Sequence, residues 1–333
     1  FRGFNGGSMK SMNMLIRTFG LTKRYGDQTV VNQIGLEVTQ GRVYGFLGPN
    51  GAGKSTTFKL LLGLTQPTAG SIEILGRDLI HNASEILPRI GSLIEGPAFV
   101  PRLTGRENVS LVADYLGAPA SAVQWVLETV DLAHAADRRA GQYSLGMKQR
   151  LGIAIALVGG PRLLLLDEPT NGLDPAGVVE IRNLIVRLTR EHGITVLVSS
   201  HILSEIEQMA DDVGIIKDGV LRYQGPLSRL RDEGRMVFRT SDLSGAAGVL
   251  AQRGIRTRVE RGELISSHLP DPVVADGVAA LARAGHQITR VEHRRRSLEQ
   301  IFLSLTETAV PATATVPVGL RPQDTSRREQ VMV

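Results

Sequence analysis

The chain has 333 residues, of which 42% are hydrophobic and 21% charged, so it can form one large globular domain, or a large and a small one. It has no cysteine, which excludes disulfides, thiolate metal sites and cysteine nucleophiles. The net charge of +5 would suit a polyanion or an acidic membrane surface, but it is modest and scattered apart from Arg294-Arg295-Arg296, so we expect no nucleic-acid partner. No apolar run approaches the roughly 20 residues that span a bilayer. We therefore expect any membrane role to depend on a partner.

The N-terminal part of the sequence predicts a leader, a strand-rich region and a glycine-rich loop. Residues 1–14 are rich in Gly and Ser, and we expect a tag or disordered leader outside the fold. Residues 15–46 have a strand-like pattern interrupted by turns. The apolar run Val43–Leu47 then leads into a glycine-rich loop, and a helical pattern follows from Thr56 to Leu64. Strand, glycine loop and helix in this order are the setting that a phosphate-binding loop requires.

The middle of the chain predicts a helical region followed by a buried parallel sheet. Residues 98–160 are mostly helical in pattern. Short strand-like runs follow at Leu163–Leu166, Thr195–Ser199 and Val213–Ile216. The first is continuously apolar, as a strand buried on both faces of a parallel sheet should be, and an amphipathic helix is expected at Val178–His192. This alternation predicts an α/β domain over residues 15–230.

The C-terminal part predicts a small α+β domain at residues 235–305. Two helical patterns separate three strand patterns, which lie at Met236–Thr240, Arg256–Glu260 and Gln287–Val291. We expect the domain to end in a helix at Ser297–Leu305, and residues 308–333 to form a disordered tail. No internal repeat is visible, so each chain carries one glycine-rich loop of the phosphate-binding kind.

The glycine-rich loop matches the phosphate-loop pattern in full. It consists of Gly48, Pro49, Asn50, Gly51, Ala52, Gly53, Lys54, Ser55 and Thr56. Its glycines allow backbone N–H groups to converge on phosphates, Lys54 can reach the β- and γ-phosphates, and the Ser55 hydroxyl can bind Mg²⁺. The alternative is a glycine-rich turn that only caps a helix, but the flanking strand and helix favour a nucleotide site.

Two acidic residues follow the apolar run Leu163–Leu166. Asp167 and Glu168 would lie at the carboxyl edge of the sheet, where ligands of such sheets bind. We expect Asp167 to hold Mg²⁺, directly or through water, and Glu168 to polarise the attacking water. Alone, such a pair could be a helix cap or a surface turn. Because it follows a phosphate loop, we interpret it as catalytic.

A second anion site is predicted at the start of another helix. Ser144 precedes an apolar helical pattern and is typical of an N-cap, and Gly146 lies in the first turn, where backbone N–H groups are free. This site is far in sequence from the phosphate loop. Two half-sites in one chain indicate two chains that face each other with nucleotide between them.

With these motifs in this order, residues 15–230 resemble the nucleotide-binding subunit of an ATP-binding cassette (ABC) transporter. The resemblance implies a P-loop NTPase fold with a RecA-like core, an antiparallel β subdomain and a helical subdomain at about 98–160. Residues 143–147 correspond to the family's signature loop, usually Leu-Ser-Gly-Gly-Gln; Ser144 and Gly146 are kept and the other three positions differ. In the family this loop contacts the γ-phosphate held by the other subunit.

The resemblance implies roles for three further positions. Tyr25 lies where the family stacks an aromatic ring on adenine, although an ordinary turn tyrosine would look the same. Asn171–Asp174 resembles the D-loop, which crosses the dimer interface. His201 resembles the switch histidine that senses the γ-phosphate, and we include it with Glu168 and Glu95 among the catalytic residues.

Glu95 is the clearest departure from the family pattern, which usually has Gln there to link the Mg²⁺ and water site to the transmembrane partner. Glu95 can accept hydrogen bonds and approach Mg²⁺, but it cannot donate and it adds a charge. Together with Ile94–Pro97, Tyr143–Arg150 and Ser199–Glu205, it makes the chain similar to the bacitracin-resistance and lantibiotic-immunity branch. Members of that branch export antibiotics or hydrophobic peptides. The segment Ser297–Phe302 also looks like the C-terminal domain of that type.

The resemblance implies that the protein is an ATPase that uses ATP and Mg²⁺. We expect it to dimerise on ATP with a second cassette, which we expect to be identical. It would drive export of a drug, antibiotic or hydrophobic peptide or lipid through a separate transmembrane permease, and lie peripherally at the cytoplasmic face of the membrane. One alternative is a soluble ABC-type ATPase acting on ribosomes or DNA, which the single cassette and the lack of a coiled-coil insertion disfavour. Another is an ATP sensor without turnover, which Glu168 disfavours, although the acidic Glu95 leaves slow turnover open.

Overall fold

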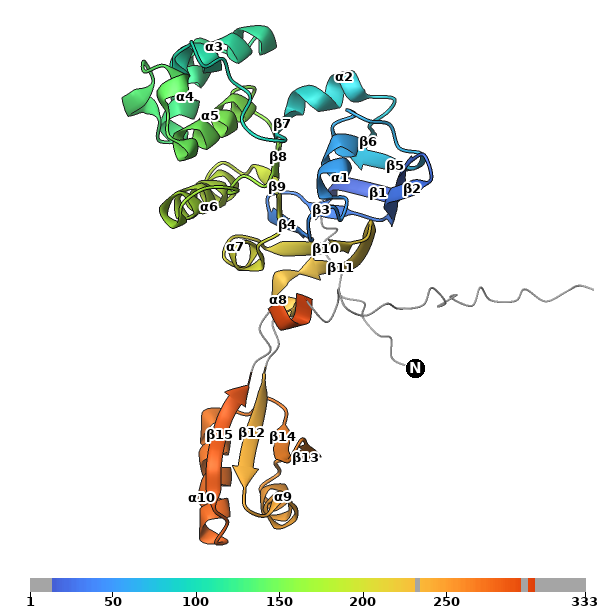
Figure 1. The fold of residues 1–333 in the computed structure, drawn as a ribbon, viewed down its shortest axis with the longest axis vertical. Helices are drawn as coiled ribbons and strands as arrows, with labels where there is room; N and C mark the ends of the chain where they lie inside the picture. The colour runs from blue at the N-terminus through green and yellow to red at the C-terminus, as the bar shows by residue number, and fades with distance from the viewer. Residues whose placement is uncertain (1–13, 231–233, 295–298, 303–333) are drawn as a thin grey trace, which may run out of the picture.

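The computed structural model describes residues 14–230, 234–294 and 299–302 (Figure 1). The expected leader up to residue 13 and the expected tail at 308–333 lie outside these ranges, and Met14, which we placed with the leader, is the first residue of a strand. Of the helix expected at 297–305, residues 299–302 are described and are helical.

An antiparallel sheet forms the first layer of the nucleotide-binding domain. Its strands are β1 (Met14–Tyr25), β2 (Gln28–Ile34), β3 (Glu37–Thr39), β5 (Ala69–Ile74) and β6 (Arg77–Asp78). The order is β2-β1-β5-β6, with β3 paired to the start of β1. Its strands pair antiparallel throughout, so the expected antiparallel β subdomain is confirmed.

The second sheet is mostly parallel and carries the site. Its strands are β4 (Val43–Leu47), β7 (Ile90–Leu93), β8 (Leu163–Asp167), β9 (Thr195–Ser200), β10 (Asp212–Lys217) and β11 (Val220–Pro226). Their order is β11-β10-β4-β9-β8-β7, and only β11 runs antiparallel to its neighbour. The carboxyl ends of β4, β8 and β9 therefore meet at one edge, which is where ligands bind in such sheets.

Alternation along β8 explains why this strand is apolar throughout. Leu163 and Leu165 belong to one core cluster, which includes α1 (Lys54–Leu61) and the antiparallel sheet. Leu164 and Leu166 belong to the cluster on the other face, with α6 (Pro175–Arg190). Because neither face of this strand contacts solvent, polar residues do not alternate with apolar ones along it. Figure 1 shows the helix α6 and the antiparallel sheet on opposite sides of this sheet.

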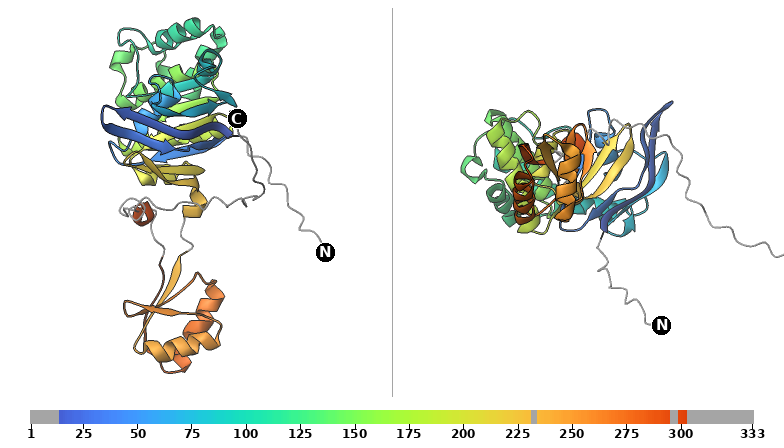
Figure 2. Two further views of the ribbon diagram at one scale, coloured as in Figure 1. Left: turned by 90° about the vertical axis from the view of Figure 1, so that its right-hand side faces the viewer. Right: turned by 90° about the horizontal axis from the view of Figure 1, so that it is seen from below.

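The helical subdomain lies between β7 and β8 in sequence. It contains α3 (Gly105–Leu116), α4 (Ala120–Thr129), α5 (Leu145–Leu157) and the short helices η2 (Ala133–Ala135) and η3 (Ala140–Gln142). Thr104 and Glu107 form a capping box that fixes the start of α3. The short helices α2 (Ala83–Ile86), η1 (Leu87–Arg89), α7 (Leu203–Glu207) and α8 (Leu227–Leu230) complete the domain. Figures 1 and 2 show α3, α4 and α5 grouped away from the antiparallel sheet.

The C-terminal domain is one antiparallel sheet with two helices. Its elements are β12 (Arg235–Thr240), α9 (Leu243–Gln252), β13 (Arg258–Glu260), β14 (Glu263–Ser266), α10 (Asp271–Arg283) and β15 (Ile288–Arg294), and the strand order is β13-β14-β12-β15. The sequence patterns predicted three strands and missed β14, which is four residues long and follows β13 after a two-residue turn. Phe238 and Leu264 pack under the helices.

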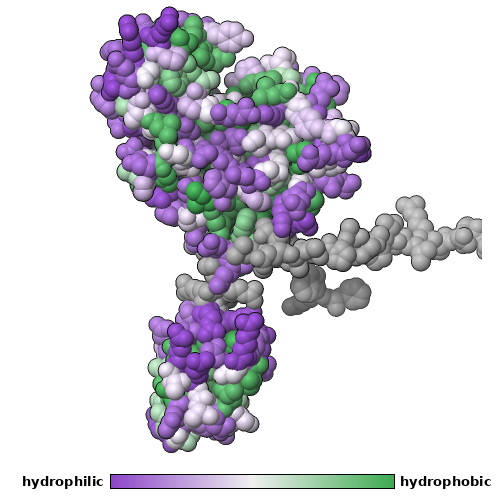
Figure 3. Space-filling view, in the orientation of Figure 1, coloured by the Kyte–Doolittle hydropathy of each residue, from purple (hydrophilic) through white to green (hydrophobic). Residues whose placement is uncertain are grey.

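Charged side chains cover the other face of this sheet. Arg294 pairs with Glu263 through two bonds of 2.8 and 3.3 Å, and these bonds lower the pKa of the Glu263 carboxyl. Figure 3 shows mostly hydrophilic side chains on the part of the domain nearest the nucleotide-binding domain. None of the helices in the described ranges is long and apolar enough to cross a membrane.

Candidate functional site

The phosphate loop lies between β4 and α1 and packs tightly against two strands. A Cβ atom at Gly48 would lie 2.4 Å from the Ile216 carbonyl oxygen, and one at Gly53 would lie 2.6 Å from that of Val30. Gly53 also has a φ of +104°, which side chains with a Cβ rarely adopt. These two glycines are therefore required by the fold itself. They leave the free N–H groups at the start of α1 next to the loop, as an anion site needs.

Lys54 is the central cation of the site. Its side chain is 4% exposed, and its ammonium donates to the carbonyl oxygens of Gly48 at 2.8 Å and Pro49 at 3.2 Å. The same nitrogen lies 3.2 Å from Oε1 of Glu168. A buried ammonium needs such partners. Phosphate oxygens would compete with Glu168 for this nitrogen, because both are anionic acceptors.

Asp167 ends β8 and is held by a residue of the neighbouring strand. The Ser199 hydroxyl, on β9, donates to Oδ1 of Asp167 at 2.5 Å, and the same oxygen atom of Ser199 accepts from the Glu168 N–H at 2.9 Å. Sequence reasoning gave Ser199 no role. The parallel register, which pairs Asp167 with Ser199, was the signal that would have found it.

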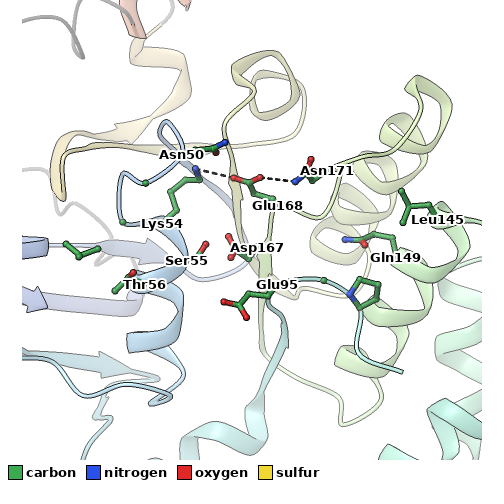
Figure 4. A pocket seen from close by; sticks show the side chains of 15 residues that line it. Asn50, Lys54, Ser55, Thr56, Glu95, Leu145, Gln149, Asp167, Glu168 and Asn171 are labelled. Carbon is green, nitrogen blue, oxygen red and sulfur yellow. Dashed lines mark hydrogen bonds and ion pairs between the residues drawn. The ribbon is translucent and has the colours of Figure 1, made fainter. Parts of the chain in front are cut away.

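Glu168 is held in an unusual backbone conformation. Its φ is +47°, a region that residues with a side chain seldom occupy outside turns and functional sites. One carboxylate oxygen pairs with Lys54, and the other, Oε2, contacts His201 Nδ1 at 3.2 Å and accepts from Asn171 Nδ2 at 3.4 Å. Figure 4 shows this carboxylate between Lys54 and Asn171. Both oxygens therefore have partners from different loops.

A cavity of about 620 Å³ joins these groups (Figure 4). Of the predicted site residues, it is lined by Asn50, Gly51, Gly53, Lys54, Ser55, Thr56, Glu95, Asp167 and Glu168. Gly48, Pro49, Ala52 and His201 are not among its lining residues, but the Gly48 and Pro49 carbonyls bind Lys54 and His201 contacts Glu168. Val30, Leu145, Gln149 and Asn171 also line it, although the sequence had not assigned them to the nucleotide.

Ser144 and Gly146 line a different cavity, of about 430 Å³. Gly172, Leu173 and Asp174 of the D-loop line the same cavity. The Ser144 side chain accepts from the Met147 N–H at 3.2 Å, which confirms the predicted N-cap. The structure therefore brings the two signature residues next to their own D-loop and not to their own phosphate loop.

Tyr143, which departs from the usual signature, anchors the loop from the inside. Its ring is 4% exposed, its hydroxyl donates to the Ala135 carbonyl at 2.7 Å, and burial raises its pKa. A Cβ at Gly105 would lie 2.2 Å from that hydroxyl oxygen. The larger residue at position 143 thus fits because position 105 is glycine.

Tyr25 and Glu95 lie at the margins of the site. Tyr25 is 50% exposed at the end of β1, with the Lys23 ammonium 4.9 Å from its ring centre, and it does not line the cavity of about 620 Å³ in the described structure. Glu95 lines that cavity, but its carboxylate accepts a 2.5 Å hydrogen bond from Lys59 and raises the pKa of that ammonium. The side chain of Glu95 is 67% exposed, so it is accessible to a partner.

Comparisons with known proteins identify the family of this chain. The pattern of the family described as ABC transporter matches residues 31–171. The bacitracin transport ATP-binding protein BcrA of Bacillus licheniformis is 50% identical over 244 residues, which are 72% of this chain and 80% of that protein. The lantibiotic transport ATP-binding protein SrtF of Streptococcus pyogenes is 45% identical over 205 residues, which are 62% of this chain and 88% of that protein.

A solved structure shows the same fold in a nucleotide-bound dimer. It is an ATP-binding cassette in a dimeric, post-hydrolysis state with ADP and Pi, at a TM-score of 0.57 and 27% identity. The match covers 64% of this chain and 98% of the other. The α/β fold class with its P-loop is therefore confirmed. The chain belongs to the ABC transporter family, as an ATP-binding subunit with ATPase activity.

Proposed function

We propose that two copies of this chain close head to tail around two ATP molecules, and that each site combines residues of both copies. The different linings of the two cavities carry this proposal: Lys54 and Glu168 line one and Ser144 and Gly146 line the other, although Leu145 borders both. A Cβ at Gly146 meets nothing within 4 Å in the described chain, so its own fold does not require glycine there. A phosphate bound by the second copy would require it.

The phosphate-loop half of the site has the groups that ATP hydrolysis needs. Lys54 and the N–H groups at the start of α1 would hold the β- and γ-phosphates. Glu168 would orient and deprotonate the attacking water, and His201, in contact with Glu168, would sense the γ-phosphate. Tyr25 would stack on the adenine, from outside the cavity.

Mg²⁺ fits the donors present. Ser55 and Asp167 line the same cavity and offer a hydroxyl and a carboxylate, the hard oxygen ligands that this ion takes together with phosphates and water. Glu95 can approach it from the opposite wall. When bound, the ion would neutralise charge that develops on the transferred phosphoryl group. No cluster of three His, Cys, Asp or Glu is found in the described residues, which suits an ion held largely by substrate.

We infer that the motor drives export of an antibiotic peptide or another drug. The support comes from two relatives whose names give bacitracin transport and lantibiotic transport. The chain would work with a separate permease and lie at the cytoplasmic face of the membrane through that contact. Glu95 lines the cavity, is exposed and departs from the usual Gln, so it is our candidate for the link between the site and the permease.

The experiment is co-expression with a candidate transmembrane permease, in a host sensitive to bacitracin and to lantibiotics. We expect the inhibitory concentration to rise for at least one of these peptides. The Glu168→Gln chain, expressed at the same level as a control, should give no such rise. An unchanged inhibitory concentration for both peptide classes, with an active ATPase in the membrane, would contradict the substrate class.

A further inference from the structure

A buried carboxylate beside the site has no role in the mechanism given above. Glu205 lies in α7 and is 7% exposed. Its partners among the described residues are two hydroxyl groups and not a cation. A carboxylate removed from water needs strong donors, so this arrangement has a cost that a neutral side chain would avoid.

Both hydroxyl groups bind the same oxygen of Glu205. The hydroxyl of the buried residue Thr170 donates to Oε2 at 2.6 Å, and the Ser200 hydroxyl lies 3.2 Å from the same atom. Hydrogen bonds to an ionised acceptor are roughly twice as strong as neutral ones. Oε2 therefore joins two segments that are 30 residues apart in the sequence.

The two segments are the loops that surround Glu168. Thr170 lies after β8, next to Asn171, and its carbonyl accepts from the Leu173 N–H at 3.2 Å in the D-loop. Ser200 ends β9, next to His201. Asn171 and His201 both contact Oε2 of Glu168.

Two carboxylates thus connect the same pair of loops at adjacent positions. Glu168 binds residues 171 and 201, and Glu205 binds residues 170 and 200. Glu168 has other tasks, because it also pairs with Lys54 and faces the cavity. Glu205 is buried and does not line the cavity in the described structure, so it is not among the groups that a nucleotide in this cavity would contact.

We propose that Glu205 is a positioning residue that fixes the D-loop and the histidine loop to each other, so that Asn171 and His201 hold the Glu168 carboxylate in its reactive orientation. This inference rests on the proposed roles of Glu168 and His201. Through Glu205, a displacement of the D-loop would alter the position of the Glu168 carboxylate. The D-loop lines the same cavity as Ser144 and Gly146. A second chain that displaces the D-loop would thereby change the position of His201.

The test compares Glu205→Ala, Glu205→Gln and, as a matched control on the exposed side of the same helix, Glu207→Ala. We expect Glu205→Ala to lower kcat about tenfold to a hundredfold, the loss that misplacement of a catalytic group causes. The Kd of ATP should change less than about twofold, because the contacts of the phosphate loop remain. Glu205→Gln keeps an oxygen acceptor for both hydroxyls and should stay within about threefold of the wild-type rate, as should Glu207→Ala.

A double-mutant cycle separates positioning from general stability. Thr170→Val and Ser200→Ala should each lower kcat, and neither should lower it further in the Glu205→Ala chain, because all three changes break one connection. These two variants also provide the test if Glu205→Ala does not fold. Additive losses, a wild-type kcat in Glu205→Ala, or a Kd of ATP that rises in step with the fall of kcat would overturn the inference.

The Glu168→Gln chain distinguishes failure of this inference from failure of the proposed function. If Glu168→Gln hydrolyses ATP rapidly, the proposed base is wrong. If Glu168→Gln is inactive and Glu205→Ala is fully active, only the role of Glu205 is wrong.

Discussion

Lys54 is enclosed by its own chain, whereas Ser144 is exposed and Gly146 faces a cavity that contains no part of the phosphate loop. The first half of the site has its charges paired and its glycines fixed by strands behind them. The second half has a capped helix start and free space in front of it. We propose that the first half is complete in a single chain and that the second binds a phosphate held by a partner chain, so the two halves should respond differently to mutation.

Glu168→Gln should have the largest effect and should separate chemistry from assembly. Loss of the general base is expected to lower kcat about a hundredfold to ten-thousandfold. The amide still fits beside Asn171 and His201, so ATP should bind and hold the dimer together. ATPase assays and size-exclusion chromatography with ATP measure both properties. Rapid turnover by this variant would show that another group is the base.

Lys54→Ala should weaken ATP binding by the phosphate-loop half of the site and leave the signature-loop half unchanged. Removal of a charge-assisted partner of the phosphates costs about 1.5–3 kcal/mol, so the Kd of ATP should rise about tenfold to a hundredfold. Equilibrium binding of a fluorescent ATP analogue measures this, with Lys59→Ala as a control cation on the same helix. An unaltered affinity would contradict the phosphate-loop assignment.

Gly146→Ala should impair the signature-loop half of the site and leave the phosphate-loop half unchanged. A Cβ at this position meets no described atom within 4 Å, and alanine favours helix over glycine by about 1 kcal/mol, so the monomer should be slightly more stable. The ATP-dependent dimer should nevertheless weaken, because the added methyl group stands where the partner's phosphate would approach. Thermal unfolding and sedimentation with ATP measure the two effects. A dimer as strong as that of the wild type would remove the argument for a shared site.

Glu95→Gln should have the smallest effect. The ion pair with Lys59 is exposed, and such pairs contribute about 0–1 kcal/mol, so stability should hardly change. The basal ATPase rate should also change little, while stimulation by the permease should shift, since Glu95 is our candidate for that contact. If the stimulated rate is unchanged as well, this position is less important for coupling than we propose.

Much of the fold and of the phosphate-loop half followed from local sequence. The glycines, Lys54 and the apolar strand ending in Asp167 form a pattern whose meaning depends on neighbours in the chain. The N-cap at Ser144 was also predictable, because a cap depends on residues three positions apart. The roles given to individual site residues remain predictions.

The rest depended on contacts between distant segments. The contacts of Ser199 depend on strand register and those of Glu205 on a helix that packs beside the site, and no local pattern assigned either residue a role. The positive φ of Glu168 occurs where its N–H bonds to Ser199 on another strand, a contact that local sequence does not show. Strand β14 was missed because four residues are too few to show a period.

The most direct test of the shared site is complementation between two inactive chains, Lys54→Ala and Gly146→Asp. Each homodimer has both sites inactivated. In a mixed dimer, the intact phosphate loop of the Gly146→Asp chain faces the intact signature loop of the Lys54→Ala chain. Random pairing makes about half of the dimers mixed, each with one intact site, so the mixture should recover about a quarter of the wild-type ATPase rate. A mixture as inactive as its two components would contradict a site built from two chains.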